Sequence, residues 1–196
     1  MKNLKIVLAS ASPRRKDLLR SLGWSFEVLP AEVAETAIDG EEPSDMVERL
    51  SLLKGRNVAA RCPDALVIAS DTIVVKDGQI YGKPRSGEDA LRMLSSLSGS
   101  VHIVHSGLAL LWQGRELCSS ERTGVRFRKL DAAALKSYVA TGEPFGKAGA
   151  YAIQGLGSLM VQSIEGSYSN VVGLPLCLLG RMMEELGFSL SLQWEV

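Results

Sequence analysis

Residues 6–15 read IVLASASPRR, so a short apolar strand leads through a turn of small hydroxyl residues into a helix. Ser12 is the expected N-cap and Pro13 the first helical residue. A helix N-terminus offers unpaired backbone N–H groups, and the guanidinium groups of Arg14 and Arg15 fit phosphate oxygens in pairs. The turn is therefore a candidate phosphate site, and a capped helix with solvated arginines is the alternative for this segment taken alone.

Short apolar runs alternate with helical patterns along the rest of the chain. Strands are predicted at 5–9, 25–29, 66–69, 73–75, 101–111, 123–128, 158–164 and 189–194. Helices are predicted to begin near residues 13, 43, 86, 131 and 175. Interleaved strands and helices indicate an α/β fold, and the consecutive strands between 101 and 128 indicate that part of the sheet is antiparallel. We expect a mixed sheet flanked by helices.

Composition limits what the protein can bind and where it works. The 196 residues are 46% hydrophobic and carry 22 basic and 22 acidic side chains. A net charge of zero predicts neither nucleic-acid nor membrane binding, so a polyanion would have to be held by a local cluster. The start of the chain lacks the pattern of a signal peptide, no apolar run is long enough to span a bilayer, and the three cysteines form an odd, dispersed set. We expect a cytoplasmic protein with free thiols.

Several familiar catalytic motifs are excluded. His102 and His105 are the only histidines, and their spacing on a strand places them on opposite faces, so they form neither a metal clamp nor a convincing catalytic triad. The loop 142–148, GEPFGKA, is one residue short of a P-loop and ends in alanine where magnesium coordination needs serine or threonine. Gly155 and Gly157 lack the third glycine of a dinucleotide-binding motif.

A dispersed set of charged residues remains as candidates. Asp71 follows the apolar strand 66–69, where a carboxylate can hold a metal or activate water, although it can also cap a local turn. Lys83 lies between a glycine and a proline that fix its backbone, and its alternative is an ordinary turn lysine. Lys54 lies beside the apolar stripe of a helix and can extend to solvent, while Glu35 belongs to an acidic loop whose simplest interpretation is solvated charge.

Five separated motifs carry a resemblance to a known family. They are SASPRR (10–15), SDTIV (70–74), GKP (82–84), KAGAYAIQG (147–155) and GSYSNVVGLP (166–175). In this order and over nearly the whole chain they resemble the Maf family of nucleoside triphosphate pyrophosphatases. The resemblance implies one Maf-like domain over residues 1–196, with an elongated mixed sheet and two lobes around a cleft, similar to the inosine-triphosphate pyrophosphatases. It also implies hydrolysis of a nucleoside triphosphate to the monophosphate and pyrophosphate with a divalent cation, Mg²⁺ or Mn²⁺.

The resemblance further implies roles for particular residues. Asp71 would accept a proton; Ser10, Arg15, Lys54 and Lys83 would contact phosphate; Arg14, Thr72 and Gln154 would set base specificity; and Glu35, with Asp71, would help hold the metal. At position 14 the chain resembles the dTTP/UTP pyrophosphatases, since the branch resembling 7-methyl-GTP pyrophosphatases typically has tryptophan where this chain has Arg14. Gly146 departs from the family pattern, because many members carry aspartate at that place, so any role of that carboxylate is in doubt here.

Gln154 also has a chemical rationale of its own. Its amide can accept a hydrogen bond from N3–H of uracil or thymine and donate one to O4, whereas cytosine presents the inverse pattern. The sequence does not separate a general-base role of Asp71 from metal ligation. Two alternatives stay open beside the dTTP/UTP pyrophosphatase: a nucleotide-binding regulator of cell division with incidental turnover, and a pyrophosphatase for modified nucleotides. A homodimer is the expected assembly on general grounds.

Overall fold

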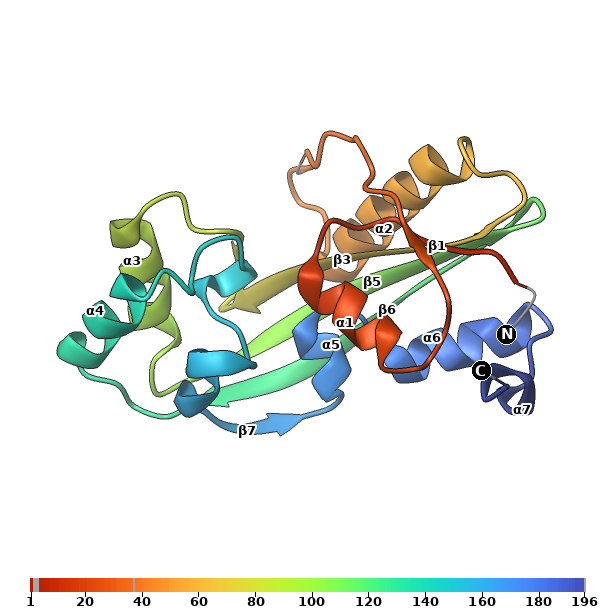
Figure 1. The fold of residues 1–196 in the computed structure, drawn as a ribbon. Helices are drawn as coiled ribbons and strands as arrows, with labels where there is room; N and C mark the ends of the chain where they lie inside the picture. Colours follow the sequence, from red (N-terminus) through yellow and green to blue (C-terminus); the bar gives the residue numbers. More distant parts are fainter. Residues whose placement is uncertain (2–3, 37, 196) are drawn as a thin grey trace. The chain divides into compact units, whose positions relative to one another are not determined.

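A computed structural model describes residues 1, 4–36 and 38–195 (Figure 1). Its strands form one seven-stranded sheet in the order β2-β1-β3-β5-β6-β7, with β4 paired to β3. Strand β1 runs parallel to both β2 and β3, whereas β3 with β4 and β6 with β7 are antiparallel, so the predicted mixed sheet is confirmed. The strands are β1 (Ile6–Leu8), β2 (Glu27–Val28), β3 (Leu66–Lys76), β4 (Gln79–Tyr81), β5 (Val101–Trp112), β6 (Arg115–Phe127) and β7 (Val161–Glu165).

Helices occupy most of the connections between strands. The α-helices are α1 (Pro13–Arg20), α2 (Pro43–Ala59), α3 (Gly87–Leu97), α4 (Ala132–Ala140), α5 (Tyr168–Val172), α6 (Leu176–Glu185) and α7 (Leu190–Gln193), and the 3-10 helices are η1 (Ala148–Ala150) and η2 (Gly155–Met160). Ser12, Ser86 and Asp131 cap α1, α3 and α4 through side-chain oxygens, as the sequence predicts. Within the described ranges no helix is long and apolar enough to cross a membrane.

The chain divides into two compact units. The first comprises Met1–Asp71, Ser106–Glu121 and Gly173–Val196, and the second comprises Thr72–His105 and Arg122–Val172. The chain therefore passes from one unit into the other within β3, β5 and β6.

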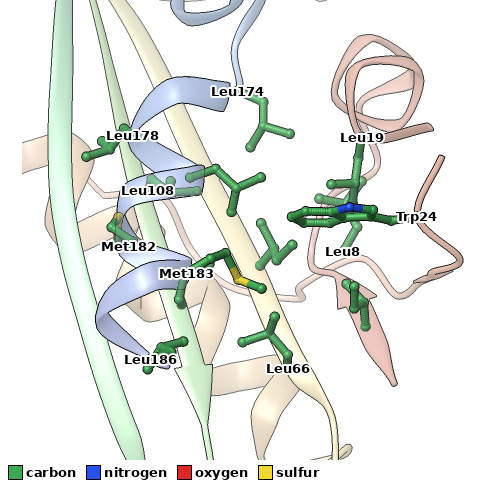
Figure 2. Packing of buried hydrophobic residues seen from close by; sticks show 14 residues of the cluster. Leu8, Leu19, Trp24, Leu66, Leu108, Leu174, Leu178, Met182, Met183 and Leu186 are labelled. Carbon is green, nitrogen blue, oxygen red and sulfur yellow. The ribbon is translucent and has the colours of Figure 1, made fainter. Parts of the chain in front are cut away.

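Alternating side chains of the first unit's strands build two separate apolar layers. Leu8, Leu66 and Leu108 join Trp24, Leu19 and the α6 side chains Met182 and Met183 in one cluster (Figure 2). The intervening residues, including Val7, Val67 and Ala109, pack with Val58 of α2 in the other. Because successive residues of a strand point to opposite faces, a strand covered on both sides reads as a continuous apolar run. This explains the unbroken hydrophobicity of residues 6–9 and 65–69.

The structure corrects three predictions about strands. The predicted strand 158–164 begins only at Val161, because residues 158–160 belong to η2. The tail 189–194, predicted as a strand, contains helix α7, because Ser189 caps it through its hydroxyl and the Trp24 indole donates to the Gln193 carbonyl at 2.9 Å. The predicted strands 66–69 and 73–75 are one strand, β3, so Asp71 lies inside a strand and not after its end. Pairing of β1 with β3 nevertheless stops at Leu8 and Ile68, so Asp71 lies beyond the carboxyl end of the parallel pair.

Candidate active site

The turn between β1 and α1 holds Arg15 in one orientation. The Arg15 Nε donates to the Gly173 carbonyl at 2.7 Å, and its Nη1 donates to Ser10 Oγ at 3.3 Å. Ser10 Oγ also accepts from the Ser12 backbone N–H at 3.2 Å, and the Gly173 carbonyl accepts from Ser70 Oγ at 2.9 Å. Ser10 and Arg15, predicted to contact phosphate, therefore lie together, and the guanidinium is fixed before any ligand arrives.

Electrostatics link Arg15 to the carboxylates of the same unit. Burial lowers the pKa of Arg15, the charges of Asp71 and Glu35 raise it, and the neighbouring Arg14 lowers it, with a net lowering. An arginine remains protonated under these influences, so the group is a permanent cation held among acids. The first unit thus gathers six of the predicted site residues: Ser10, Arg14, Arg15, Glu35, Lys54 and Asp71.

Lys54 of α2 forms an ion cluster with both predicted metal ligands. Its Nζ lies 2.5 Å from Asp71 Oδ1 and 2.8 Å from Glu35 Oε1. Lys54 and Asp71 are both buried, whereas the Glu35 side chain is 46% exposed. A phosphate contact was the expectation for Lys54, and in the structure its charge is shared by two carboxylates. Removing one partner of such a buried ion pair leaves the charge of the other partner buried without compensation.

Helix α2 also fixes the backbone of Asp71. The Asp71 N–H donates to Ser51 Oγ at 3.1 Å, and Ser51 Oγ in turn donates to the Val47 carbonyl at 2.5 Å. Residues three apart share a face of a helix, so Ser51 and Lys54 hold the main chain and the carboxylate of Asp71 from the same side. Sequence reasoning missed Ser51, although its spacing from Lys54 was a usable signal.

The remaining predicted residues belong to the second unit. Thr72 follows Asp71 in β3 and is half-buried, Lys83 follows β4 and is exposed, and Gln154 lies half-buried directly before η2. The Gly149 N–H donates to the Gly82 carbonyl at 3.1 Å. The motif that contains Lys83 is therefore hydrogen-bonded to the motif that contains Gln154.

Two carboxylates, Glu35 and Asp71, are suited to a hard divalent cation. Both approach a single nitrogen, the Lys54 Nζ, so their oxygens already converge around one positive charge. No group of three or more histidine, cysteine, aspartate or glutamate side chains that could hold a metal occurs in the described ranges. Magnesium on nucleotides is commonly held by only one or two carboxylates, with phosphate oxygens and water completing the shell. The donor set fits that arrangement and not an all-protein metal cage.

Histidine and cysteine are not part of this cluster. The pKa of buried His102 is lowered to about 4, chiefly by burial and also by the charge of Lys76. Burial, together with Glu48, raises the pKa of Cys118 to about 11, so its thiol stays protonated near neutral pH. All three cysteines, Cys62, Cys118 and Cys177, are free.

The chain is similar to members of one protein family over most of its length. The chain matches the family described as Maf-like protein over residues 5–186. A dTTP/UTP pyrophosphatase of Syntrophotalea carbinolica is 54% identical over 187 residues, covering 93% of this chain and 84% of the relative. A dTTP/UTP pyrophosphatase of Citrifermentans bemidjiense is 52% identical over 179 residues, covering 90% and 93%.

Solved structures are similar at much lower identity. The Ham1 protein of Staphylococcus aureus matches with a TM-score of 0.45 and 16% identity, covering 63% of this chain and 71% of that one. The HAM1 protein of Coxiella burnetii matches with a TM-score of 0.47 and 14% identity, covering 63% and 73%. The family match and the identity to the curated relatives span nearly the whole chain, and this protein belongs to the Maf family.

Proposed function

We propose that this protein hydrolyses dTTP and UTP to the nucleoside monophosphate and pyrophosphate. The observation that carries the proposal is the cluster of Asp71, Lys54, Glu35 and Arg15, in which the buried Lys54 and the half-buried Arg15 interact with the buried carboxylate of Asp71. Relatives about half identical over most of their length are named dTTP/UTP pyrophosphatases. A protein that only binds nucleotides needs cations for phosphate but does not need a buried carboxylate among them.

Cleavage between the α and β phosphates requires neutralisation of a polyanion and a water placed in line with the α phosphorus. Ser10, Arg15 and Lys83 would contact phosphate oxygens, with the orientation of Arg15 set by the Gly173 carbonyl. Asp71 would accept the proton of the attacking water, because its carboxylate is held in place by the lysine Nζ and its backbone by α2.

Glu35 and Asp71 would hold a divalent cation, Mg²⁺ or Mn²⁺. When bound, the cation would neutralise phosphate charge and lower the pKa of a bound water. Lys54 would then share the two carboxylates with the cation, or turn toward a phosphate as the family resemblance implies. Arg14, Thr72 and Gln154 would select the base, and the amide of Gln154 matches N3–H and O4 of uracil and thymine.

Product analysis tests the reaction directly. Incubation of UTP with the protein and Mg²⁺ is expected to give UMP and pyrophosphate in equal amounts, separated by ion-exchange chromatography. Release of orthophosphate and UDP, or undiminished turnover in EDTA, would contradict the proposal. A panel of canonical and modified triphosphates should rank UTP and dTTP above CTP, ATP and GTP; a higher rank for a modified nucleotide would reassign the substrate.

Asp71→Asn tests the role of the carboxylate. We expect turnover to fall by about 10² or more, since the substitution removes both the proton acceptor and a metal ligand. The fold should persist, because the Lys54 ammonium retains Glu35 at 2.8 Å and asparagine keeps the backbone bond to Ser51. Nucleotide binding and the unfolding midpoint, measured beside the kinetics, separate a chemical loss from unfolding. Normal turnover in a folded variant would show that Asp71 is structural.

A further inference from the structure

Glu143 lies outside the site described so far, in the loop after α4, and its carboxylate gathers three donors within the second unit. The Tyr138 hydroxyl and the Gly157 N–H both donate to Oε1 at 2.8 Å. The Leu156 N–H donates to Oε2 at 3.0 Å. Both backbone donors belong to η2, the short helix that begins directly after Gln154.

These donors make Glu143 the cap of a helix to which it does not belong. The first N–H groups of a helix have no partner inside it, and the side chain of the N-cap residue commonly satisfies them. Gln154 occupies the N-cap of η2, yet its side chain makes no capping hydrogen bond. Glu143, eleven residues earlier in the chain, caps the helix in its place, so the amide of Gln154 is not consumed by its own helix.

Gly155 leaves the space that allows Glu143 to cap η2 in place of the Gln154 side chain. Its φ is +69°, and a Cβ at this position would lie 2.7 Å from Glu143 Oε2. Any residue with a side chain would therefore meet both a disfavoured backbone conformation and the carboxylate. Because Gly155 has no Cβ, the Glu143 carboxylate can lie against the Gly155 backbone, next to Gln154.

The charge state of Glu143 supports the same arrangement. Burial alone would raise its pKa, but the Gly157 N–H, the Tyr138 hydroxyl, the Leu156 N–H and the charge of Lys147 lower it overall. The group is therefore ionised at neutral pH, and an ionised carboxylate is an acceptor at both oxygens. Glutamine, with one acceptor and one donor at the same place, cannot accept from both backbone groups.

We propose that Glu143 is a positioning residue for base recognition: by capping η2 it fixes the backbone of Gln154 and leaves the Gln154 amide for the pyrimidine. The inference rests on the proposed function, in which Gln154 reads the base. It concerns selectivity between bases and not the chemistry at the phosphate, because the Glu143 carboxylate accepts hydrogen bonds from η2, which follows Gln154, and from Tyr138 of α4.

The test compares Glu143→Gln with a matched control, Ser86→Ala. Ser86 also caps a helix of the same unit, accepting from the Asp89 N–H at 3.1 Å, but that helix, α3, carries neither Gln154 nor Tyr138. For each protein kcat/KM for UTP and for CTP is measured, together with inhibition by inorganic tripolyphosphate, a probe of the phosphate contacts alone, and the thermal unfolding midpoint.

Glu143→Gln is expected to lower the UTP-to-CTP ratio of kcat/KM by about tenfold, with tripolyphosphate inhibition unchanged. Ser86→Ala is expected to lower the unfolding midpoint with the ratio unchanged. A folded Glu143→Gln protein with the wild-type ratio, or an equal fall in the Ser86→Ala protein, would overturn the inference.

A second variant covers the case in which Glu143→Gln does not fold. Glu143→Asp keeps the charge and withdraws the carboxylate by one methylene, so its ratio should lie below that of the wild type. An unchanged ratio in that folded variant would equally overturn the inference. A wild-type protein that hydrolyses UTP and CTP alike would instead contradict the proposed function, and the inference would fall with it.

Discussion

Substitution of His102 should remove a defined part of the protein's sensitivity to acid. His102 of β5 is 1% exposed, its Nε2 lies 2.8 Å from the Tyr151 hydroxyl, and its ring meets Phe127 edge-on. Its Nδ1 has no hydrogen-bond partner within the described ranges. Burial, with a contribution from the charge of Lys76, lowers the pKa from 6.5 to about 4, because a second proton would place a charge in an apolar environment.

The sign and size of the effect follow from this shift. Between pH 6.5 and about 4 the unfolded chain binds a proton at His102 that the folded chain does not, so the free energy of unfolding falls as the pH falls. The contribution of neutral His102 to the free energy of unfolding is fully present above pH 6.5. The shift corresponds to about 2 kcal/mol lost between pH 7.5 and 5, and about 3 kcal/mol in the limit below pH 4.

The assay is urea unfolding of the wild type and of His102→Gln at pH 7.5, 6 and 5. Glutamine does not titrate, so the free energy of unfolding of the variant should fall less with acid, by about 2 kcal/mol over this range. His105, whose pKa burial also lowers, is present in both proteins and cancels. NMR titration of the two imidazoles gives an independent reading. Parallel stability curves, or a His102 pKa near 6.5, would refute the reasoning.

Two further predictions concern packing and charge in the first unit. Gly107→Ala would place a Cβ 2.1 Å from the Val47 carbonyl oxygen of α2, and should lower the free energy of unfolding by about 2 kcal/mol or more. Gly55→Ala meets only the end of a leucine side chain and gains about 1 kcal/mol of helix propensity, so its loss should be smaller in thermal unfolding, and the reverse order would contradict this. Lys54→Met should cost about 3–5 kcal/mol by leaving the Asp71 charge buried without its cation. Adding Asp71→Asn should restore part of that loss, whereas strictly additive losses in denaturant unfolding would argue against the coupling.

Features decided by neighbouring residues could be predicted from the sequence. The caps Ser12, Ser86 and Asp131 were predicted because a side-chain oxygen bonds to a backbone N–H only three residues away. The mixed sheet follows from alternating strand and helix patterns. The tail was predicted wrongly because Leu190, Leu192 and Trp194 alternate with polar residues as in a strand, while a distant indole and a local hydroxyl cap decide for helix α7.

Residues brought together over long sequence separations could not be predicted from local patterns. The polar residues Ser70 and Asp71 looked like a break between two strands, yet they continue β3 because the Gly173 carbonyl, Ser51 and Lys54 satisfy them. Nor did the sequence indicate that Glu143 caps η2. The glycine and lysine spacing of its loop carries no such signal, because the two backbone N–H groups that Glu143 accepts from lie 13 and 14 residues away.

The five separated motifs reduce to two hydrogen-bonded groups, one in each unit. In the first unit the Gly173 carbonyl, from the last motif, accepts from Arg15 of the first motif and from Ser70 of the second. In the second unit the Gly149 N–H, from the fourth motif, donates to the Gly82 carbonyl of the third. Each of these hydrogen-bonded groups uses a backbone atom of a glycine, so it depends on the position of the main chain more than on the identity of a side chain. Glycines distant in sequence therefore help to place the charged residues beside these hydrogen bonds, which are Arg15, Asp71 and Lys83. A substitution that displaces one of these glycines should weaken the function of two or three motifs at once.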